Sequence, residues 1–375
     1  MQQPSENAPS ATPNTVESAT PELKKSEAED TINSAKSVTV TQLHLRGHKW
    51  KKCMYPYNYC NKKDTSGKYI SRISQRSEAE LQSGKVLMEQ VKSPPYFYYF
   101  SLAVDSCDVN IKDIDIKECI ESDASPGKKY MSLKLKREGS LGMDLEEKAA
   151  DVAKSQNEKQ LFRFILDMQL YLLISVGKLN AAKIVHGQLT ASNIMYNDKG
   201  DTPKISDFGY SHPVVVTWKE YEEMKNKTGA SSNAIPCKTF DETLLTALCN
   251  KTKADETTLE EILSQFMGDD NSLFRGSIWT DAERSSIYTR YREMFQKGGK
   301  NMETFKSECL KTMGSWNEYA VVATFLELVT DHAEWIPEKR SEYIELSKRY
   351  ILQTADAPAL KKELQKMLIQ SQNPL

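Results

Sequence analysis

Residues 184–211, IVHGQLTASNIMYNDKGDTPKISDFGYS, bring imidazole, amide and carboxylate side chains together at close spacing. They are His186, Gln188, Asn193 and Asp207. An imidazole or a carboxylate can take up a proton during a reaction, whereas the amide of Gln188 can orient a hydroxyl group but has no useful basicity. Apolar residues lie between these positions. A turn at residues 198–201, with a glycine available for positive φ, predicts two short strands around it.

The spacing of His186 and Asn193, followed by the triplet Asp207-Phe208-Gly209, resembles the catalytic and metal-binding segment of protein kinases. In that family an Asp two residues after the His accepts the substrate hydroxyl proton. The Asn and the Asp of the triplet hold Mg²⁺. The resemblance therefore implies metal ligands at Asn193 and Asp207. Gln188 stands at the catalytic Asp position beside His186, where a positioned base typically contributes ~10² to 10⁴-fold to the rate.

A second match precedes this segment. Residues 67–74, GKYISRIS, alternate like a strand and resemble the kinase strand whose Lys pairs with the nucleotide phosphates and with a helix Glu. Arg72 replaces that Lys, and its planar fork is not interchangeable with an ammonium group. A helix is predicted at residues 77–92, where Glu80 is the expected partner of Arg72. In the alternative interpretation, its acidic residues only stabilise the helix N-terminus. The strand, helix and following aromatic run also resemble divergent kinases encoded by large DNA viruses.

Other parts of the family pattern are altered or missing. Residues 128–143 predict a strand that runs into a hinge, and the resemblance implies that the backbone of Lys136 and Arg137 binds adenine. An exposed β-turn would have the same composition. The glycine-rich phosphate loop is missing, because only Gly47 and Gly67 are available and neither has the required spacing. No Ala-Pro-Glu triplet closes the segment after Asp207.

The C-terminal half predicts a helical domain. Residues 160–180 have a broad apolar face, typical of a nearly buried helix. Residues 315–329 resemble the central helix of this kinase lobe, with Asn317 in place of the Asp that braces the catalytic-loop backbone. The intervening stretch, at about 215–310, contains helical patterns and is predicted to be a folded insertion. It occupies the place where kinases dock protein substrates, so we expect it to form a partner surface.

Composition agrees with one two-lobed domain and a tail. The chain has 375 residues and a net charge of −2, which gives no sign of a strongly basic nucleic-acid binder. No apolar run approaches twenty residues, so no membrane span is expected. Residues 1–37 predict a disordered tail. The expected fold is α+β and protein kinase-like, with a small β-rich N-lobe at 38–140 and a helical C-lobe at 141–375.

Seven cysteines are scattered without Cys-x-x-Cys spacing. We interpret them as reduced thiols of an intracellular, cytoplasmic protein. The alternative is a metal held by Cys53 and Cys60 with His44 and His48.

Three functions are compatible with these observations. The first is a catalytically impaired pseudokinase that binds ATP and Mg²⁺ weakly and acts through protein partners. The second is an active, atypical Ser/Thr protein kinase in which another carboxylate, such as Asp198 or Asp201, or the substrate itself compensates for Gln188. The third is a non-enzymatic, helical interaction module.

Overall fold

A computed structural model describes the part of the chain that carries the site. The described residues are 54–56, 58–59, 62–63, 69–74, 77–109, 130–136, 141–197, 202–228, 238–249, 256–267, 278–332, 334–353 and 356–372. All of them belong to one compact unit, Val40–Leu375. Several expectations lie outside them: the tail at 1–37, the site at Cys53 and Cys60, the hinge residue Arg137, and the carboxylates Asp198 and Asp201.

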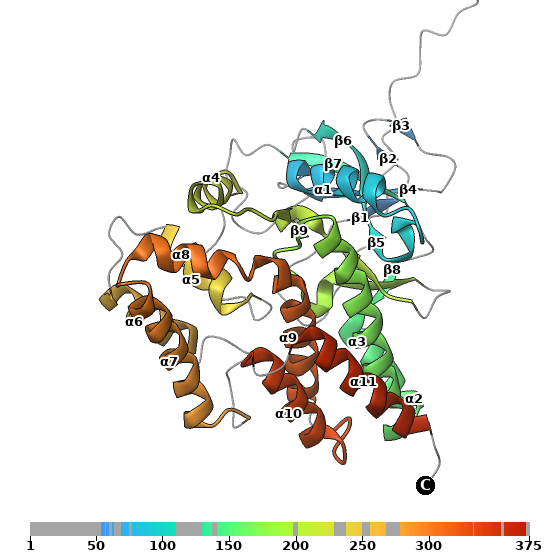
Figure 1. The fold of residues 1–375 in the computed structure, drawn as a ribbon. Coiled ribbons are helices and arrows are strands. Elements are labelled where there is room, and N and C mark those ends of the chain that lie inside the picture. Colours follow the sequence, from blue (N-terminus) through green and yellow to red (C-terminus); the bar gives the residue numbers. More distant parts are fainter. Residues whose placement is uncertain are drawn as a thin grey trace, which may run out of the picture. The chain divides into compact units, whose positions relative to one another are not determined.

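The chain has an α+β fold whose first sheet is antiparallel. Its order is β1 (Met54–Pro56), β4 (Tyr69–Ser74), β7 (Tyr130–Lys136) and β6 (Ala103–Val109). Strands β2 (Asn58–Tyr59) and β3 (Lys62–Lys63) pair with each other. Helix α1 (Ser77–Gln90) packs against β6 and β7 (Figure 1), and its Leu81 lies against the buried side chains of Leu133 and Leu135.

A second sheet joins segments that are far apart in the sequence. Its order is β5 (Phe100–Ser101), β11 (Lys204–Ser206), β10 (Ile194–Asn197) and β8 (Leu141–Asp144). Strands β10 and β11 are antiparallel, so the prediction of two short strands in this segment is confirmed. Strand β11 runs parallel to β5, which follows the short helix η1 (Tyr96–Tyr98). Strands β9 (Ile184–Val185) and β12 (His212–Pro213) form a separate two-stranded antiparallel sheet.

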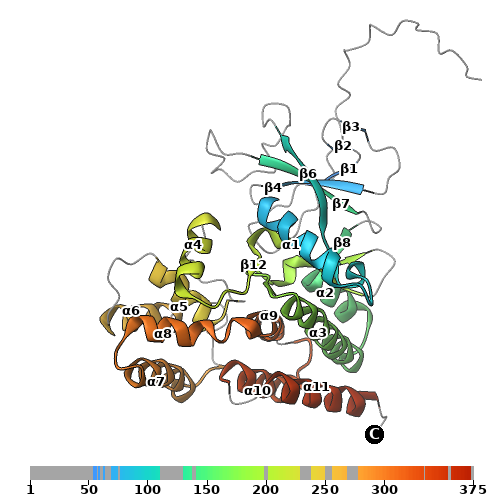
Figure 2. The ribbon, with the colours of Figure 1, turned by 45° about the horizontal axis from the view of Figure 1, so that its top comes forward.

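Long helices form the main core. They are α2 (Leu145–Ser155), α3 (Glu158–Ala181), α9 (Trp316–Asp331), α10 (Arg340–Ile351) and α11 (Ala357–Gln372). Helix α3 contacts α2, α9 and α11 (Figures 1 and 2). Among the described helices, only α3 has the length and apolar composition to cross a membrane. Half of its most apolar window is nevertheless buried inside the protein. These contacts confirm the expected core helix at 160–180.

Between the second sheet and α9, the described residues form five further α-helices. They are α4 (Trp218–Thr228), α5 (Phe240–Cys249), α6 (Glu256–Met267), α7 (Asp281–Lys297) and α8 (Met302–Leu310). Helix α5 contacts α6 and α8, and α8 also contacts α4 and α7. Buried aromatic rings fill the space between them, including Phe240, Tyr291 and Phe305. The helices expected within this insertion are therefore present.

The cysteines differ from expectation at one position. Cys107, on β6, is disulfide-bonded, whereas Cys249 and Cys309 are free. The interpretation of all seven cysteines as reduced thiols is therefore wrong at Cys107. Burial raises the pKa of the Cys249 thiol to about 11 and that of Cys309 well above its ordinary value. Both thiols consequently stay protonated and unreactive near neutral pH.

His212 is a buried imidazole on β12. Its Nδ1 donates a hydrogen bond to the Pro213 carbonyl oxygen, 3.1 Å away. Burial lowers the pKa of His212 to about 4, and nearby Lys225 contributes in the same direction, while Glu242 opposes it. The folded protein therefore keeps this ring neutral in a pH range where the unfolded chain protonates it.

We expect the free energy of unfolding to fall as the pH drops from about 6.5 to about 4, because only the unfolded state then binds the His212 proton. The contribution of this one group is about 3 kcal/mol over that range. Chemical denaturation of the wild type and of His212→Gln at several pH values measures it as the difference between the two curves. Parallel curves would contradict the assignment.

Candidate functional site

The strand pair β10 and β11 places two predicted metal ligands at one end. Asn193 ends the short helix η3 (Ala191–Asn193) and directly precedes β10, while Asp207 directly follows β11. Because the strands are antiparallel and Ile194 pairs with Ile205, both residues lie at the same end of the pair. The Ser206 hydroxyl also donates to the Asn193 carbonyl oxygen at 3.0 Å. The two elements are therefore held in fixed register.

Asn193 also shapes the loop that carries Gln188. Its Nδ2 donates to the Gln188 carbonyl oxygen at 2.7 Å, and Asn193 is only 3% exposed. Of the two ends of this amide, the oxygen is the one with the chemistry of a metal ligand. Gln188 itself is half-buried. Its position is set by its backbone rather than by its side chain.

Asp207 has a left-handed backbone conformation, with φ 68° and ψ 66°. Such a conformation is uncommon outside glycine and persists when the surrounding structure holds it. Here the Asp207 Oδ1 lies 3.2 Å from the Arg72 Nη1, and the following residue begins the short helix η4 (Phe208–Tyr210). The Asp207 side chain is 24% exposed, so one side of the carboxylate faces solvent.

Arg72 forms the expected ion pair with Glu80. Its Nη2 donates to the Glu80 Oε2, and the two side chains are 5% and 0% exposed. Burial by itself would lower the pKa of the Arg72 guanidinium. The charges of Asp207 and Glu80 outweigh burial and raise that pKa above its ordinary value. Arg72 therefore stays charged and links β4, α1 and the start of η4.

His186 has a packing role rather than the catalytic one considered from sequence. It is fully buried, and its Nε2 donates to the Ser206 carbonyl oxygen at 3.1 Å. The centre of its ring lies 4.8 Å from that of the Phe208 ring. Phe208 in turn packs against Phe100 on strand β5 of the second sheet. A fully buried imidazole has no surface from which it could reach a solvent-borne substrate. His186 instead fixes the residues on either side of Asp207.

Asn317, near the start of α9, holds the backbone of the loop that carries His186 and Gln188, as expected. Its Oδ1 accepts from the His186 backbone N–H at 2.8 Å, and its Nδ2 donates to the Ile184 carbonyl oxygen at 2.7 Å. The same Nδ2 also donates to the Asn180 Oδ1 at 2.8 Å. Further along α9, the Thr324 hydroxyl donates to the Leu189 carbonyl oxygen at 2.8 Å. Helix α9 thus holds the loop through backbone groups.

A glycine and a pair of hydroxyl groups at the site were missed by sequence reasoning. Gly187 has φ 76°, and a Cβ there would collide with the Tyr210 carbonyl oxygen. Its place between His186 and Gln188 was the available signal, because glycine favours such turns. The second is a hydroxyl pair, Ser83 on α1 and Ser211 after η4, whose Oγ atoms lie 2.7 Å apart. No local pattern identifies a contact between residues so far apart in sequence.

The predicted hinge is described only in part. Lys136 is the last residue of β7. The next described element is β8, whose last residue, Asp144, pairs with Met195 of β10. Asp144 caps α2 by accepting from the Glu147 backbone N–H, and burial raises its pKa to about 6. This residue was not predicted, although Asp before an acidic first turn is typical of a helix N-terminus.

The donor set fits a phosphate-bound Mg²⁺ better than a protein cage. Among the described residues, no group of three or more His, Cys, Asp or Glu side chains is placed to hold a metal ion. Asn193 and Asp207 offer one amide oxygen and one carboxylate. Mg²⁺ commonly binds one or two carboxylates and completes its octahedron with water and substrate phosphates. Two protein ligands at one strand end are therefore compatible with Mg²⁺ that arrives with a nucleotide.

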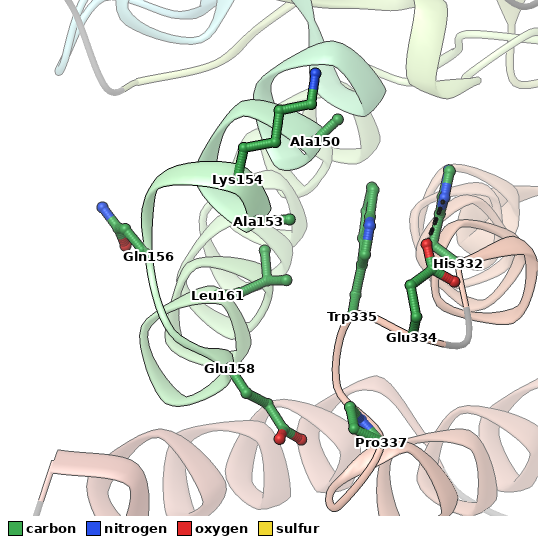
Figure 3. Close-up of a pocket in the computed structure, with 10 residues that line it drawn as sticks. All are labelled: Ala150, Ala153, Lys154, Gln156, Glu158, Leu161, His332, Glu334, Trp335 and Pro337. Atoms are coloured by element: carbon green, nitrogen blue, oxygen red, sulfur yellow. Dashed lines mark ion pairs between the residues drawn. The ribbon is translucent and has the colours of Figure 1, made fainter.

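A cavity of about 450 Å³ lies elsewhere, between α2, the start of α3 and the turns after α9 (Figure 3). The His332 ring stacks on Trp335 at 3.9 Å, and His332 Nδ1 lies 3.6 Å from a Glu334 carboxylate oxygen. None of the predicted site residues lines this cavity. It is therefore separate from the loop and strand ends described above.

Comparisons with known proteins add no family assignment. No protein-family model matches the chain, and no curated protein matches it. The interpretation of the site consequently depends on residue spacing and on the contacts above.

We expect Asn317→Ala to lower the free energy of unfolding by about 2–4 kcal/mol, because two buried backbone groups, at His186 and Ile184, lose their partner. Thr324→Val is the matched control on the same helix. It removes a single hydrogen bond to the loop, so its expected effect is about 1 kcal/mol. Urea denaturation measures both. Equal losses in the two variants would show that Asn317 is not the main brace.

Proposed function

We propose that the chain is a two-lobed, protein kinase-like protein with impaired phosphoryl transfer, which binds ATP and Mg²⁺ weakly and acts through protein partners. One observation carries this proposal: Arg72 contacts both Glu80 and Asp207 in a buried setting. In protein kinases, a strand cation paired with a helix Glu and an Asp that holds Mg²⁺ must both be in place for activity. Arg72, Glu80 and Asp207 stand at the positions of these three groups in the sequence, and Arg72 contacts both carboxylates.

The order of the strands supports the same proposal. Arg72 lies on β4, which pairs with β7, and β7 runs toward the predicted hinge at Lys136. Asn193 and Asp207 lie at the end of the β10 and β11 pair. In a purely helical interaction module the short motifs would match by chance. Chance matches would not bring Arg72 into contact with both Glu80 and Asp207. The helical module is therefore the weaker alternative.

Impaired chemistry follows from position 188. A kinase needs a group there that accepts the substrate hydroxyl proton, and the Gln188 amide does not accept it at neutral pH. The polar groups that remain would bind and orient: Asn193 and Asp207 toward Mg²⁺, and Arg72 toward a phosphate. Bound Mg²⁺ would supply charge neutralisation for the phosphates. An active, atypical Ser/Thr kinase remains the second candidate, because Asp198 and Asp201 follow the same loop in the sequence.

The inserted helices support a role in partner binding. They occupy the sequence between the site and α9, and their buried rings, such as Tyr291 and Phe305, belong to the same hydrophobic core as the residues of α9. A folded element of this size is more than an ordinary connection between a strand and a helix requires. Val216, which leads into α4, is 79% exposed. We assign the docking of a protein partner to this insertion.

The first test is nucleotide binding. We expect calorimetry to give a Kd for ATP near about 1 mM, equivalent to about −4 kcal/mol, and somewhat tighter binding with Mg²⁺ than with EDTA. In Asp207→Ala the difference between Mg²⁺ and EDTA should disappear, because the one carboxylate ligand is lost. Failure of the wild type to bind at millimolar ATP under both conditions would rule out the nucleotide-binding part of the proposal.

The second test is transfer of the γ-phosphate to generic protein acceptors. We expect the wild type to stay near background and Gln188→Asp to raise the rate. The gain should be smaller than the ~10² to 10⁴-fold of a fully competent base, since Arg72 and the missing glycine-rich pattern still limit phosphate positioning. Gln188→Asn, which also lacks a base, is the control. Wild-type turnover on the order of 1–100 s⁻¹, usual for kinases, would instead support the active enzyme.

A further inference from the structure

The Arg72 guanidinium reaches two carboxylates on different elements. Its Nη2 contacts Glu80 of α1, and its Nη1 lies 3.2 Å from the Asp207 Oδ1. A guanidinium presents several N–H donors in a planar fork, so it can hold two carboxylates at once in fixed geometry. A lysine ammonium is a compact point charge with different reach. The substitution of Arg for Lys at this position therefore changes how firmly Asp207 is held.

Asp207 is also the only carboxylate among the two predicted metal ligands. A cation that approaches it from the solvent side, where the side chain is 24% exposed, meets an oxygen set already partly neutralised by Arg72. The Arg72 guanidinium therefore places one positive charge against the carboxylate that a metal would use. Arg72 and Mg²⁺ thus compete for the same charge.

The Asp207 conformation is supported from within the protein. Phe208 is fully buried against Phe100 and His186, and the Ser211 hydroxyl contacts Ser83 of α1. With the Arg72 contact, these interactions hold Asp207 and the segment that follows it.

We propose that Arg72 determines the cofactor preference of this site: it takes over part of the role of the divalent cation at Asp207 and makes ATP binding only slightly dependent on Mg²⁺. This inference rests on the proposed binding of ATP. It assigns Arg72 a specificity role beyond that of a phosphate contact. The measurement that tests this role is the ratio of the ATP affinity in Mg²⁺ to the ATP affinity in EDTA. A variant that is merely less stable has no reason to change this ratio in the predicted direction.

Calorimetric titration of the full-length protein with ATP, in excess Mg²⁺ and in EDTA, measures this ratio. For the wild type we expect a ratio of no more than about threefold, and for Arg72→Lys a ratio of about tenfold or more, because an ammonium group lacks the planar fork that reaches Glu80 and Asp207 at once. In Glu80→Gln the whole charge of Arg72 faces Asp207, so the ratio should fall to about one. Circular dichroism and urea denaturation establish that each variant is folded.

The possible outcomes separate this inference from the proposed function. If the wild type binds ATP in neither condition, the proposed function fails. If it binds ATP and both folded variants keep the wild-type ratio, the Arg72 inference is overturned while nucleotide binding stands. A wild-type ratio above that of Arg72→Lys would also overturn it. Should Arg72→Lys not fold, Glu80→Gln decides, since an unchanged or larger ratio in that variant contradicts the inference.

Discussion

A buried guanidinium between two carboxylates is the interaction on which the rest of the site depends. Removing Arg72 from water is unfavourable unless opposite charges lie close by, and it cannot discard its proton to escape that cost. Glu80 and Asp207 meet this requirement from α1 and from the start of η4. Because each carboxylate comes from a different element, one side chain sets the distance between the first sheet, its helix and the segment that follows β11.

Asn317 provides the complementary constraint from the helical core. A carboxylate at this position would only accept hydrogen bonds, whereas the amide accepts from the His186 N–H and donates to the Ile184 carbonyl oxygen. Both backbone groups are thereby satisfied by one buried side chain without a buried charge. The departure from the kinase pattern at this position thus keeps the brace, and the loop stays attached to α9.

Local sequence patterns predicted individual strands and helices, but they did not predict contacts between residues that are far apart in the sequence. The strand pair around the turn and the core helix α3 follow from turn residues and apolar periodicity, whereas the Arg72 pair with Glu80 was expected from the resemblance to the kinase strand and helix. Other contacts join residues that approach each other only through tertiary packing. They are the Arg72 contact with Asp207, the Ser83 contact with Ser211, and the close approach of Gly187 to the Tyr210 carbonyl oxygen. Likewise, the chemical type of His186 suggested catalysis, but the packing of Phe208 against it buries the ring.

At position 188 the fold depends on the backbone and not on the type of side chain. Its fixed contact is made by the carbonyl oxygen, which accepts from Asn193 and which any residue supplies. The side chain at 188 is therefore not tied to the fold. By contrast, Arg72, Glu80 and Phe208 are buried, and replacing them leaves an unpaired charge or a cavity. The stability of the fold thus depends on Arg72, Glu80 and Phe208, whereas it does not depend on the side chain at position 188. A protein that works by binding can retain these three residues and lack an Asp at position 188 without loss of stability.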